Sequence, residues 1–383
     1  MKVTDRSLTR RRWLGSLASW PALAAANAPT AAHAPTAANA PVQTDLFRQK
    51  QEGVHTYRIP ALIETPKGTL LAIADARHDG VRDLPARISI VMRTSRDHGR
   101  TWTPIRTIRK VAEGGVGDPS LLLDRKSGRV WCFHAYGPPG IGFPTAEPGP
   151  LTGPKVLQIH AMYSDDDGAS WSEPVDLTPQ LRDPSWHAVF ATSGTHFQTR
   201  RGRYLVPLVV RDGNHNITAR NAYSDDRGKT WSVGPAIGPG TDESKAVELS
   251  DGSILQNMRN GTRRAVAISR DGGVRFERLR HHPDLVDPSC NAGLLSFKHK
   301  GRHLVVFTNA ASSKRENLQI SISLDGGETW PHRRVLHAGP AAYSTVIALK
   351  NGSLGVLYER GDQSPVEHIT FARVPLQWVL GSR

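Results

Sequence analysis

The sequence predicts an all-β protein, specifically a six-bladed β-propeller of four-stranded antiparallel blades, and three observations support this. A box of the form Ser-x-Asp-x-Gly-x-Thr-Trp recurs along the 383 residues. Apolar strand patterns surround the boxes and long amphipathic helical patterns are absent. The 35 Gly and 27 Pro residues indicate many turns and few long helices. Repeats of this kind are typical of propellers, and blades of roughly 50–60 residues would divide the folded part into about six.

The boxes start 69, 60, 45 and 54 residues apart. They occupy residues 95–102, 164–171, 224–231, 269–276 (a degraded copy ending in Phe) and 323–330. We expect each to be a hairpin turn, in which Asp accepts hydrogen bonds from turn amides, Gly takes a positive φ and Trp packs beneath the turn. Calcium binding by the run 165–167 is an alternative, but the loop lacks the downstream bidentate Glu of an EF-hand. Regular repetition also argues against a catalytic role for the boxes.

Period-two and continuous apolar runs of strand length predict the remaining elements. These runs cover residues 70–74, 88–92, 130–135, 204–210, 265–268, 304–308, 318–322 and 354–358.

The N-terminus has the layout of an export signal rather than of a folded element. Three consecutive arginines, Arg10 to Arg12, precede a short Ala-rich apolar stretch with possible cleavage sites. We predict a twin-arginine-type signal peptide at 1–26, an Ala/Pro-rich linker at 27–44 and the propeller at 45–383. The apolar stretch is too short for a stable membrane span. We therefore expect a periplasmic or secreted protein without a transmembrane segment.

The charge, the cysteine count and the absence of certain motifs argue against a nucleic-acid-binding protein, a disulfide-rich scaffold and a metalloprotein. With 49 Lys and Arg against 35 Asp and Glu, the formal charge is +14. Residues 1–26 hold five Lys and Arg and one Asp, so their removal would lower it to +10. No nucleic-acid-binding motif accompanies this charge, so we expect no nucleic-acid partner. Cys132 and Cys290 are too few for a disulfide-rich scaffold or a four-cysteine zinc site, although one disulfide stays open. The absence of HExxH or clustered Cys/His motifs predicts no metal or other cofactor.

The segment 57–62, Tyr-Arg-Ile-Pro-Ala-Leu, followed by five boxes in order, resembles the exo-α-sialidase (neuraminidase) family, especially secreted bacterial members. The resemblance covers essentially all of residues 45–383. It implies a six-bladed propeller acting on terminal sialic acids, which are nine-carbon sugars with a carboxylate at the anomeric carbon. It also implies a site with three arginines, an Asp acid/base and a Tyr nucleophile paired with Glu.

By local motif, the resemblance assigns the catalytic roles to three residues. Asp83, 25 residues after the Arg-Ile-Pro arginine, matches the acid/base, with Asp79 and Asp75 as competitors. Tyr343 matches the nucleophile. Glu243 matches its base, with Glu248 as the rival. A neutral phenol is suited to this attack because an anionic carboxylate nucleophile would be repelled by the substrate carboxylate.

The resemblance also implies the substrate-binding residues. Arg58, Arg259 and Arg315 match the three arginines, whose planar forks suit a carboxylate. Glu359 matches the residue that steadies the first arginine, and Asp118 the one that contacts ring substituents. The segment containing Trp186, His187 and Phe190 would line the acyl or aglycone side. His196 stands where relatives usually carry Gly, and its imidazole would either narrow the cleft or read a different substituent of the sugar.

These residues predict a retaining exo-α-sialidase that acts on sialylated glycans, glycoproteins or glycolipids, and we expect a monomer. A trans-sialidase or a hydrolase of another nonulosonic acid is the alternative within the same chemistry. A non-catalytic glycan-binding propeller is the alternative from another class, but it would need no nucleophile.

Overall fold

The computed structural model describes residues 40–381, so the predicted signal at 1–26 and most of the predicted linker at 27–44 lie outside the described residues. Within that range the chain forms 25 strands and very little helix, which confirms the all-β prediction. The exceptions are a 3₁₀ turn, η2 (Gln51–Gly53), and two short helices, α1 (Thr178–Leu181) and α2 (Leu376–Leu380). No helix among residues 40–381 is long and apolar enough to cross a membrane.

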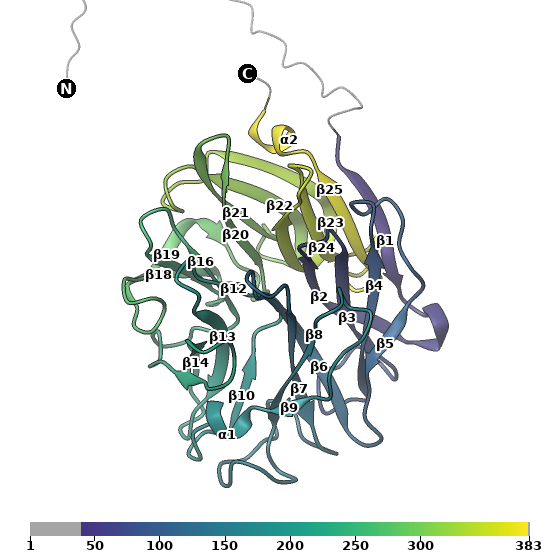
Figure 1. Ribbon diagram of the computed structural model, residues 1–383, viewed down its shortest axis with the longest axis vertical. Coiled ribbons are helices and arrows are strands. Elements are labelled where there is room, and N and C mark those ends of the chain that lie inside the picture. The colour runs from purple at the N-terminus through teal and green to yellow at the C-terminus, as the bar shows by residue number, and fades with distance from the viewer. Residues whose placement is uncertain (1–39, 382–383) are drawn as a thin grey trace, which may run out of the picture. The chain divides into compact units, whose positions relative to one another are not determined.

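The strands form five sheets, mostly from consecutive antiparallel neighbours (Figure 1). The first sheet has the order β2 (Thr56–Glu64), β3 (Leu70–Arg77), β4 (Ile88–Ser95), β5 (Arg106–Arg109). The second has the order β6 (Gly115–Leu123), β7 (Val130–Gly137), β8 (Gln158–Ser164), β9 (Val175–Asp176), with β11 (Gly194–Thr195) parallel to β6. The third has the order β10 (Ala188–Ala191), β13 (Tyr204–Arg211), β14 (Ile217–Ser224), β15 (Ser232–Val233), with β12 (Phe197–Gln198) also on β13. The fourth has the order β16 (Ser244–Glu248), β17 (Ile254–Met258), β18 (Arg263–Ser269), β19 (Glu277–Val286).

The fifth sheet has seven strands, which departs from the predicted set of separate four-stranded units. Its order is β20 (Gly293–His299), β21 (Arg302–Ala310), β22 (Glu316–Ser323), β23 (His332–Ala348), β24 (Leu354–Arg360), β25 (His368–Val374), β1 (Val42–Arg48). The cause is the 17-residue strand β23, which pairs with β22 up to Pro340 and with β24 from Ala341. It thereby joins two antiparallel groups of four strands that share it.

The N-terminal strand β1 completes this sheet against β25, near the C-terminus (Figure 1). β1 begins at Val42, inside the segment expected to be linker, so regular structure starts before residue 45.

The five boxes form the turns that join the third and fourth strands of their groups, with the predicted turn chemistry. In each box the Gly N–H donates to the Ser hydroxyl at 2.8–2.9 Å. The box Asp accepts the backbone N–H four residues on at 2.8–3.0 Å. In the acidic box, Asp165 pairs with Arg129 and Asp167 with Lys67, so these carboxylates already have cationic partners and calcium is not needed to neutralise them.

Each box glycine packs against the preceding sheet. Every one has φ between +81° and +94° and lies where a Cβ would crowd a neighbouring side chain. The pairs are Gly168 with Leu71 (2.8 Å), Gly228 with Trp131 (3.0 Å), Gly273 with Leu205 (2.6 Å), Gly327 with Leu255 (2.8 Å), and Gly99 with Phe371 of the last strands. The boxes therefore act as joints between successive sheets.

The hydrophobic core is divided among clusters that each join two successive groups of strands. Representative pairs that share a cluster are Leu70 with Phe371, Ile73 with Leu121, Phe133 with Val206, Leu205 with Ile254, Leu255 with Phe307, and Val306 with Val356. The first pair connects the first sheet to the last one, so the succession of contacts returns to its start.

Candidate active site

A cavity of about 470 Å³ lies where several sheets begin. Its lining includes residues from β2, β6 and β10, from just before β16, and from the second half of β23. Its polar lining contains five of the eight predicted site residues, Asp83, Asp118, Glu243, Arg259 and Tyr343. Residues far apart in the chain therefore meet here, from the β3–β4 loop, β6, the approach to β16, the end of β17, and β23.

The strands that carry site residues are bulged at these positions. Register shifts occur between Arg58 and Ala61 in β2, between Gly117 and Ser120 in β6, and between Ala341 and Ser344 in β23. Ile59 (φ 62°) and Asp118 (φ 56°) adopt the left-handed region, which is strained for a β-branched residue such as Ile59. Bulges re-aim side chains, so the local irregularities direct these residues toward the cavity.

Tyr343, Glu243 and Arg259 form one hydrogen-bonded group. The Tyr343 hydroxyl donates a short hydrogen bond to Oε2 of Glu243. Nη1 of Arg259 donates to the same oxygen at 3.0 Å and to the Tyr343 hydroxyl at 3.4 Å, and its Nε lies 3.3 Å from Oδ2 of Asp242. Tyr343 is 8% exposed and Glu243 3% exposed. The phenol and its proton acceptor are thus already paired, and both are largely shielded from solvent.

Burial sets the protonation states of this pair. Desolvation raises the pKa of Tyr343 well above its ordinary value, and the charge of Glu243 adds to the rise. Desolvation also raises the pKa of Glu243, against the lowering effect of Arg259. The phenol is therefore neutral before reaction, with a carboxylate of increased basicity as its neighbour.

Glu359 holds Arg58 and the backbone around the tyrosine. Its carboxylate accepts from Nε and Nη2 of Arg58 at 3.1 and 3.0 Å, from the Ile59 N–H at 2.8 Å and from the Tyr343 N–H at 3.2 Å. Glu359 is fully buried. Burial alone would lower the pKa of Arg58, but the charge of Glu359 raises it above its ordinary value.

Arg58 and Arg315 lie close to the Tyr343 ring, in addition to Arg259 at its hydroxyl. The guanidinium carbons of Arg58 and Arg315 lie 5.2 and 5.6 Å from the ring centroid. Nη2 of Arg315 donates to the Ser289 carbonyl at 2.8 Å. The structure therefore brings all three predicted arginines to one tyrosine.

Asp83 is the exposed carboxyl of the cavity lining. Its side chain is 73% exposed, and Oδ1 lies 2.7 Å from Nη2 of Arg77. Asp118 lines the same cavity, and desolvation followed by the charges of Asp75 and Asp83 raises its pKa well above the ordinary value. An accessible carboxyl that lines the same cavity as a buried tyrosine is suited to proton transfer to and from a leaving group and water.

Comparisons with known proteins agree with this arrangement. A family model described as a BNR repeat-like domain matches residues 68–356. A curated sialidase of Micromonospora viridifaciens is 38% identical over 98% of this chain and 61% of its own length. The chain belongs to the BNR-repeat sialidase family.

Other sialidases show the same likeness. A Bacteroides fragilis sialidase is 34% identical over 85% of this chain and 63% of its own length, so the chain spans about three fifths of these two relatives. The solved Hadza microbial sialidase Hz136 has a TM-score of 0.83 and 31% identity, covering 88% of this chain and 69% of that one.

The rival carboxylates of this sialidase-family chain lie elsewhere. Asp79 pairs with Arg87 on the exposed surface, at 2.6 Å, and does not line the cavity. Glu248 pairs with Arg200 at 3.1 Å and borders other hollows. Asp75 is buried and does not line the cavity. Their positions leave Asp83 and Glu243 as the candidates that border the site.

One prediction about the cleft of this family member is wrong. His196 does not narrow it, because β11 runs along β6 toward the far end of that strand. There His196 is buried, with its ring 6.3 Å from Phe133, and borders a separate cavity. Of the predicted wall residues only Phe190 lines the site. Trp186 packs under Arg220, and His187 stacks on His215.

Sequence reasoning considered Asp75 only as an acid/base candidate, and it missed several other residues around the sialidase-family site. Asp75 and Arg77 are both 1% exposed in β3, and the signal was two charged residues ending an otherwise apolar strand. Lys245, two residues after Glu243, is buried and donates to Asn291 Oδ1 at 2.9 Å and to the Ser193 carbonyl. The apolar wall comes from Phe143, Pro144, Leu157 and Ile217, mostly on the β7–β8 loop, whose sequence carries no strand pattern.

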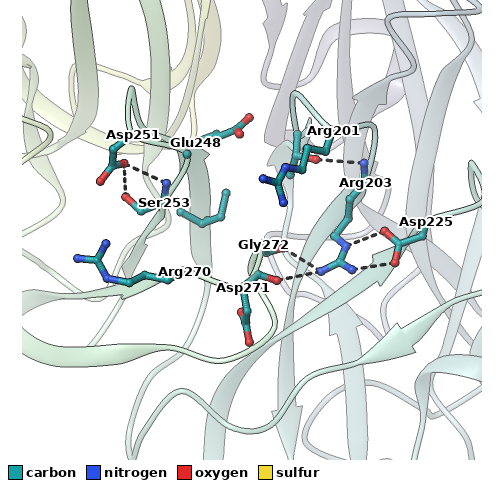
Figure 2. A pocket seen from close by; sticks show the side chains of 12 residues that line it. Arg201, Arg203, Asp225, Glu248, Asp251, Ser253, Arg270, Asp271 and Gly272 are labelled. Atoms are coloured by element: carbon teal, nitrogen blue, oxygen red, sulfur yellow. Dashed lines mark hydrogen bonds and ion pairs between the residues drawn. The ribbon is translucent and has the colours of Figure 1, made fainter.

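A separate hollow of about 400 Å³ lies between two box turns and contains none of the predicted site residues (Figure 2). Arg203 crosses it, with Nε and Nη2 bonded to Asp225 at 2.7 Å and Nη1 directed to the carbonyls of Asp271 and Gly272. Its charged groups thus tie one box to the next.

Cys132 and Cys290 are both buried and unpaired, so the disulfide left open by the sequence is not formed. No group of three or more His, Cys, Asp or Glu suited to a metal occurs among residues 40–381.

Proposed function

We propose that the protein is a retaining exo-α-sialidase that hydrolyses terminal sialic acids from glycoconjugates through a covalent intermediate on Tyr343. The observation that carries this proposal is the buried hydrogen bond from the Tyr343 hydroxyl to Glu243, inside a cavity flanked by arginines. A glycan-binding protein has no use for a phenol paired with its own base. The family membership supports the same chemistry.

The three arginines would hold the substrate carboxylate. Arg58 uses Nε and Nη2 for Glu359, which leaves its remaining amino group for a ligand. Arg259, at the end of β17, reaches the Tyr343 hydroxyl, and Arg315, just before β22, lies over the Tyr343 ring. Several guanidinium groups around one carboxylate give bidentate, charge-assisted bonds, and they would place the anomeric carbon of an α-linked sialoside beside the Tyr343 oxygen.

The first step forms a bond between the Tyr343 oxygen and the anomeric carbon as the bond to the leaving oxygen breaks. Glu243 takes the phenol proton, and Asp83 gives a proton to the departing oxygen. The attacking group is neutral until it reacts, so it is not repelled by the substrate carboxylate, whereas an anionic nucleophile at about 4 Å would be. Tyrosine nucleophiles are the accepted exception to two-carboxylate glycosidases in this class of enzyme.

The second step reverses these transfers. Asp83, now a carboxylate, takes a proton from water as the water oxygen attacks the anomeric carbon. The bond to Tyr343 breaks, and the proton held by Glu243 returns to the phenolate. Two inversions at one carbon give overall retention.

The experiment is proton NMR of an aryl α-sialoside during hydrolysis. The proposal expects the α-anomer of free sialic acid to appear first, before mutarotation, and Tyr343→Phe to lose most turnover while staying folded. If the β-anomer appears first, the enzyme inverts and the covalent step is refuted. If sialyl groups appear mainly on added lactose rather than as free acid, the protein is a trans-sialidase.

We propose a six-bladed propeller as the architecture. It is supported by six antiparallel groups of four strands, five of them with a box, and by side-chain clusters that link each group to the next. The group that lacks a box ends in β25 and β1, which come from opposite ends of the chain and have no connecting turn. A crystal structure that showed another number of blades would refute it.

We propose export to the periplasm or beyond, on the basis of the arginine-rich start of the sequence. Replacing Arg11 and Arg12 by Lys should keep the protein in the cytoplasmic fraction of a bacterial host. Unchanged export of that variant would contradict a twin-arginine route.

A further inference from the structure

Asp75 and Arg77 form a buried charged pair that contacts two residues of the cavity lining, Asp83 and Asp118. Both residues belong to β3, and each is 1% exposed. Oδ2 of Asp75 accepts from Nε and Nη2 of Arg77 at 3.3 and 3.1 Å. A buried charge pair is costly to desolvate, so the strand carries it at the expense of apolar packing.

Arg77 connects this pair to the loop that holds Asp83. The same Nη2 lies 2.7 Å from Oδ1 of Asp83, and Nη1 donates to the Val81 carbonyl at 2.6 Å. One planar guanidinium therefore binds both a backbone carbonyl and a carboxyl of this loop, in its exposed stretch 81–83. Since Asp75 binds two of its nitrogens, the direction of the fork depends on Asp75.

The other oxygen of Asp75 supports Asp118. Oδ1 accepts the Asp118 N–H at 3.0 Å, at the bulge where Asp118 has φ 56°. Gly117 lies directly over the carboxylate, and a Cβ there would be 3.3 Å from both oxygens. The strained bend that turns Asp118 toward the cavity is thus built on Asp75.

We propose that Asp75 is a positioning residue that fixes Asp83 through Arg77 and Asp118 through its backbone N–H, and so sets the geometry of acid catalysis. This inference rests on the proposed function. Two carboxyl groups, those of Asp75 and Asp83, contact the Arg77 guanidinium. Desolvation raises the pKa of Asp75 to about 7, against the lowering effect of Arg77.

The test variant is Asp75→Asn, which keeps the size of the side chain. An Asn has one acceptor oxygen, so its NH₂ group must face either the Arg77 fork or the Asp118 N–H, both of which are donors. A misplaced general acid matters most for a poor leaving group, and general acid catalysis contributes about 10²–10⁴-fold. We expect kcat/KM to fall about 100-fold on a sialyl-galactoside and less than about threefold on 4-nitrophenyl sialoside, whose leaving group needs no proton.

The matched control is Asp79→Asn, because that carboxylate pairs with Arg87 at the surface. It should leave both rates unchanged. A general structural defect in Asp75→Asn would lower kcat/KM equally on the two substrates, so equal losses would overturn the inference. If Asp75→Asn does not fold, Arg77→Lys serves instead, and the same dependence on leaving group is required. A single ammonium cannot reproduce the planar fork that binds Asp75 through two nitrogens and also reaches Asp83 and the Val81 carbonyl. A wild-type protein inactive on both sialosides would instead refute the proposed function.

Discussion

Glu359→Gln tests the most heavily used side chain of the site. The carboxylate accepts four hydrogen bonds, two from Arg58 and one each from the Ile59 and Tyr343 N–H groups, and it is fully buried. A Gln has one oxygen and so retains the two bonds made to one carboxylate oxygen, while its NH₂ group faces the two other donors. Arg58 is left as a buried cation without its counter-charge.

Breaking a buried ion pair by removing one partner costs about 3–5 kcal/mol, because the remaining charge stays desolvated. That loss is a large part of the roughly 5–15 kcal/mol that holds a domain together. Urea unfolding followed by circular dichroism at pH 7 would measure it. The matched control is Glu277→Gln, which breaks the exposed pair with Arg270 (3.2 Å) and should cost no more than about 1 kcal/mol. A loss below about 1 kcal/mol for Glu359→Gln would refute the assigned role of this carboxylate.

Three further variants test the joints, the buried cation and the carboxylate site. Gly99→Ala should destabilise the protein by about 1–3 kcal/mol more than Gly68→Ala, because both have positive φ but only Gly99 lies against Phe371; equal thermal shifts would contradict the joint. Desolvation lowers the pKa of Lys245 from 10.5 to about 7, so from pH 7 to 9 the unfolded chain keeps a proton that the native state has lost. Wild-type stability should therefore rise over that range by about 2 kcal/mol more than that of Lys245→Met in urea titrations, and parallel curves would contradict it. Arg315→Ala should weaken the binding of free sialic acid about 10- to 100-fold in calorimetry, as expected for a charged hydrogen bond of about 1.5–3 kcal/mol, and unchanged affinity would mean that Arg315 does not hold the ligand.

The repeated boxes made the all-β class and the turn chemistry predictable. Each box is a local motif whose Ser, Asp and Gly bond to one another within a few residues, so sequence spacing carries the information. The pairing of β1 with β25 could not be read in the same way. Its register joins Val42 to Arg373 across the whole chain, and no local signal separates that strand from the Ala/Pro-rich segment before it.

The same difference between local motifs and long-range contacts explains which site residues could be predicted. Arg58, Glu243 and Tyr343 stand in recognisable short motifs, and the structure brings them together. Asp75 was weighed only as a competitor of Asp83, because spacing cannot tell a carboxylate that lines a cavity from one buried beneath it. His196 was misjudged because the direction of a strand decides which end of the fold a side chain reaches, and β11 follows β6 away from the site.

The most direct test of the central claim is to trap the intermediate. A sialosyl fluoride with a second fluorine at C3 reacts with the nucleophile through its good leaving group, while the C3 fluorine slows hydrolysis by disfavouring the cationic transition state. Intact-protein mass spectrometry followed by peptide mapping would locate the added sugar. The account predicts one adduct per chain on Tyr343, absent from Tyr343→Phe. An adduct on Asp83, on Glu243 or on any other residue, formed while the substrate turns over, would contradict it.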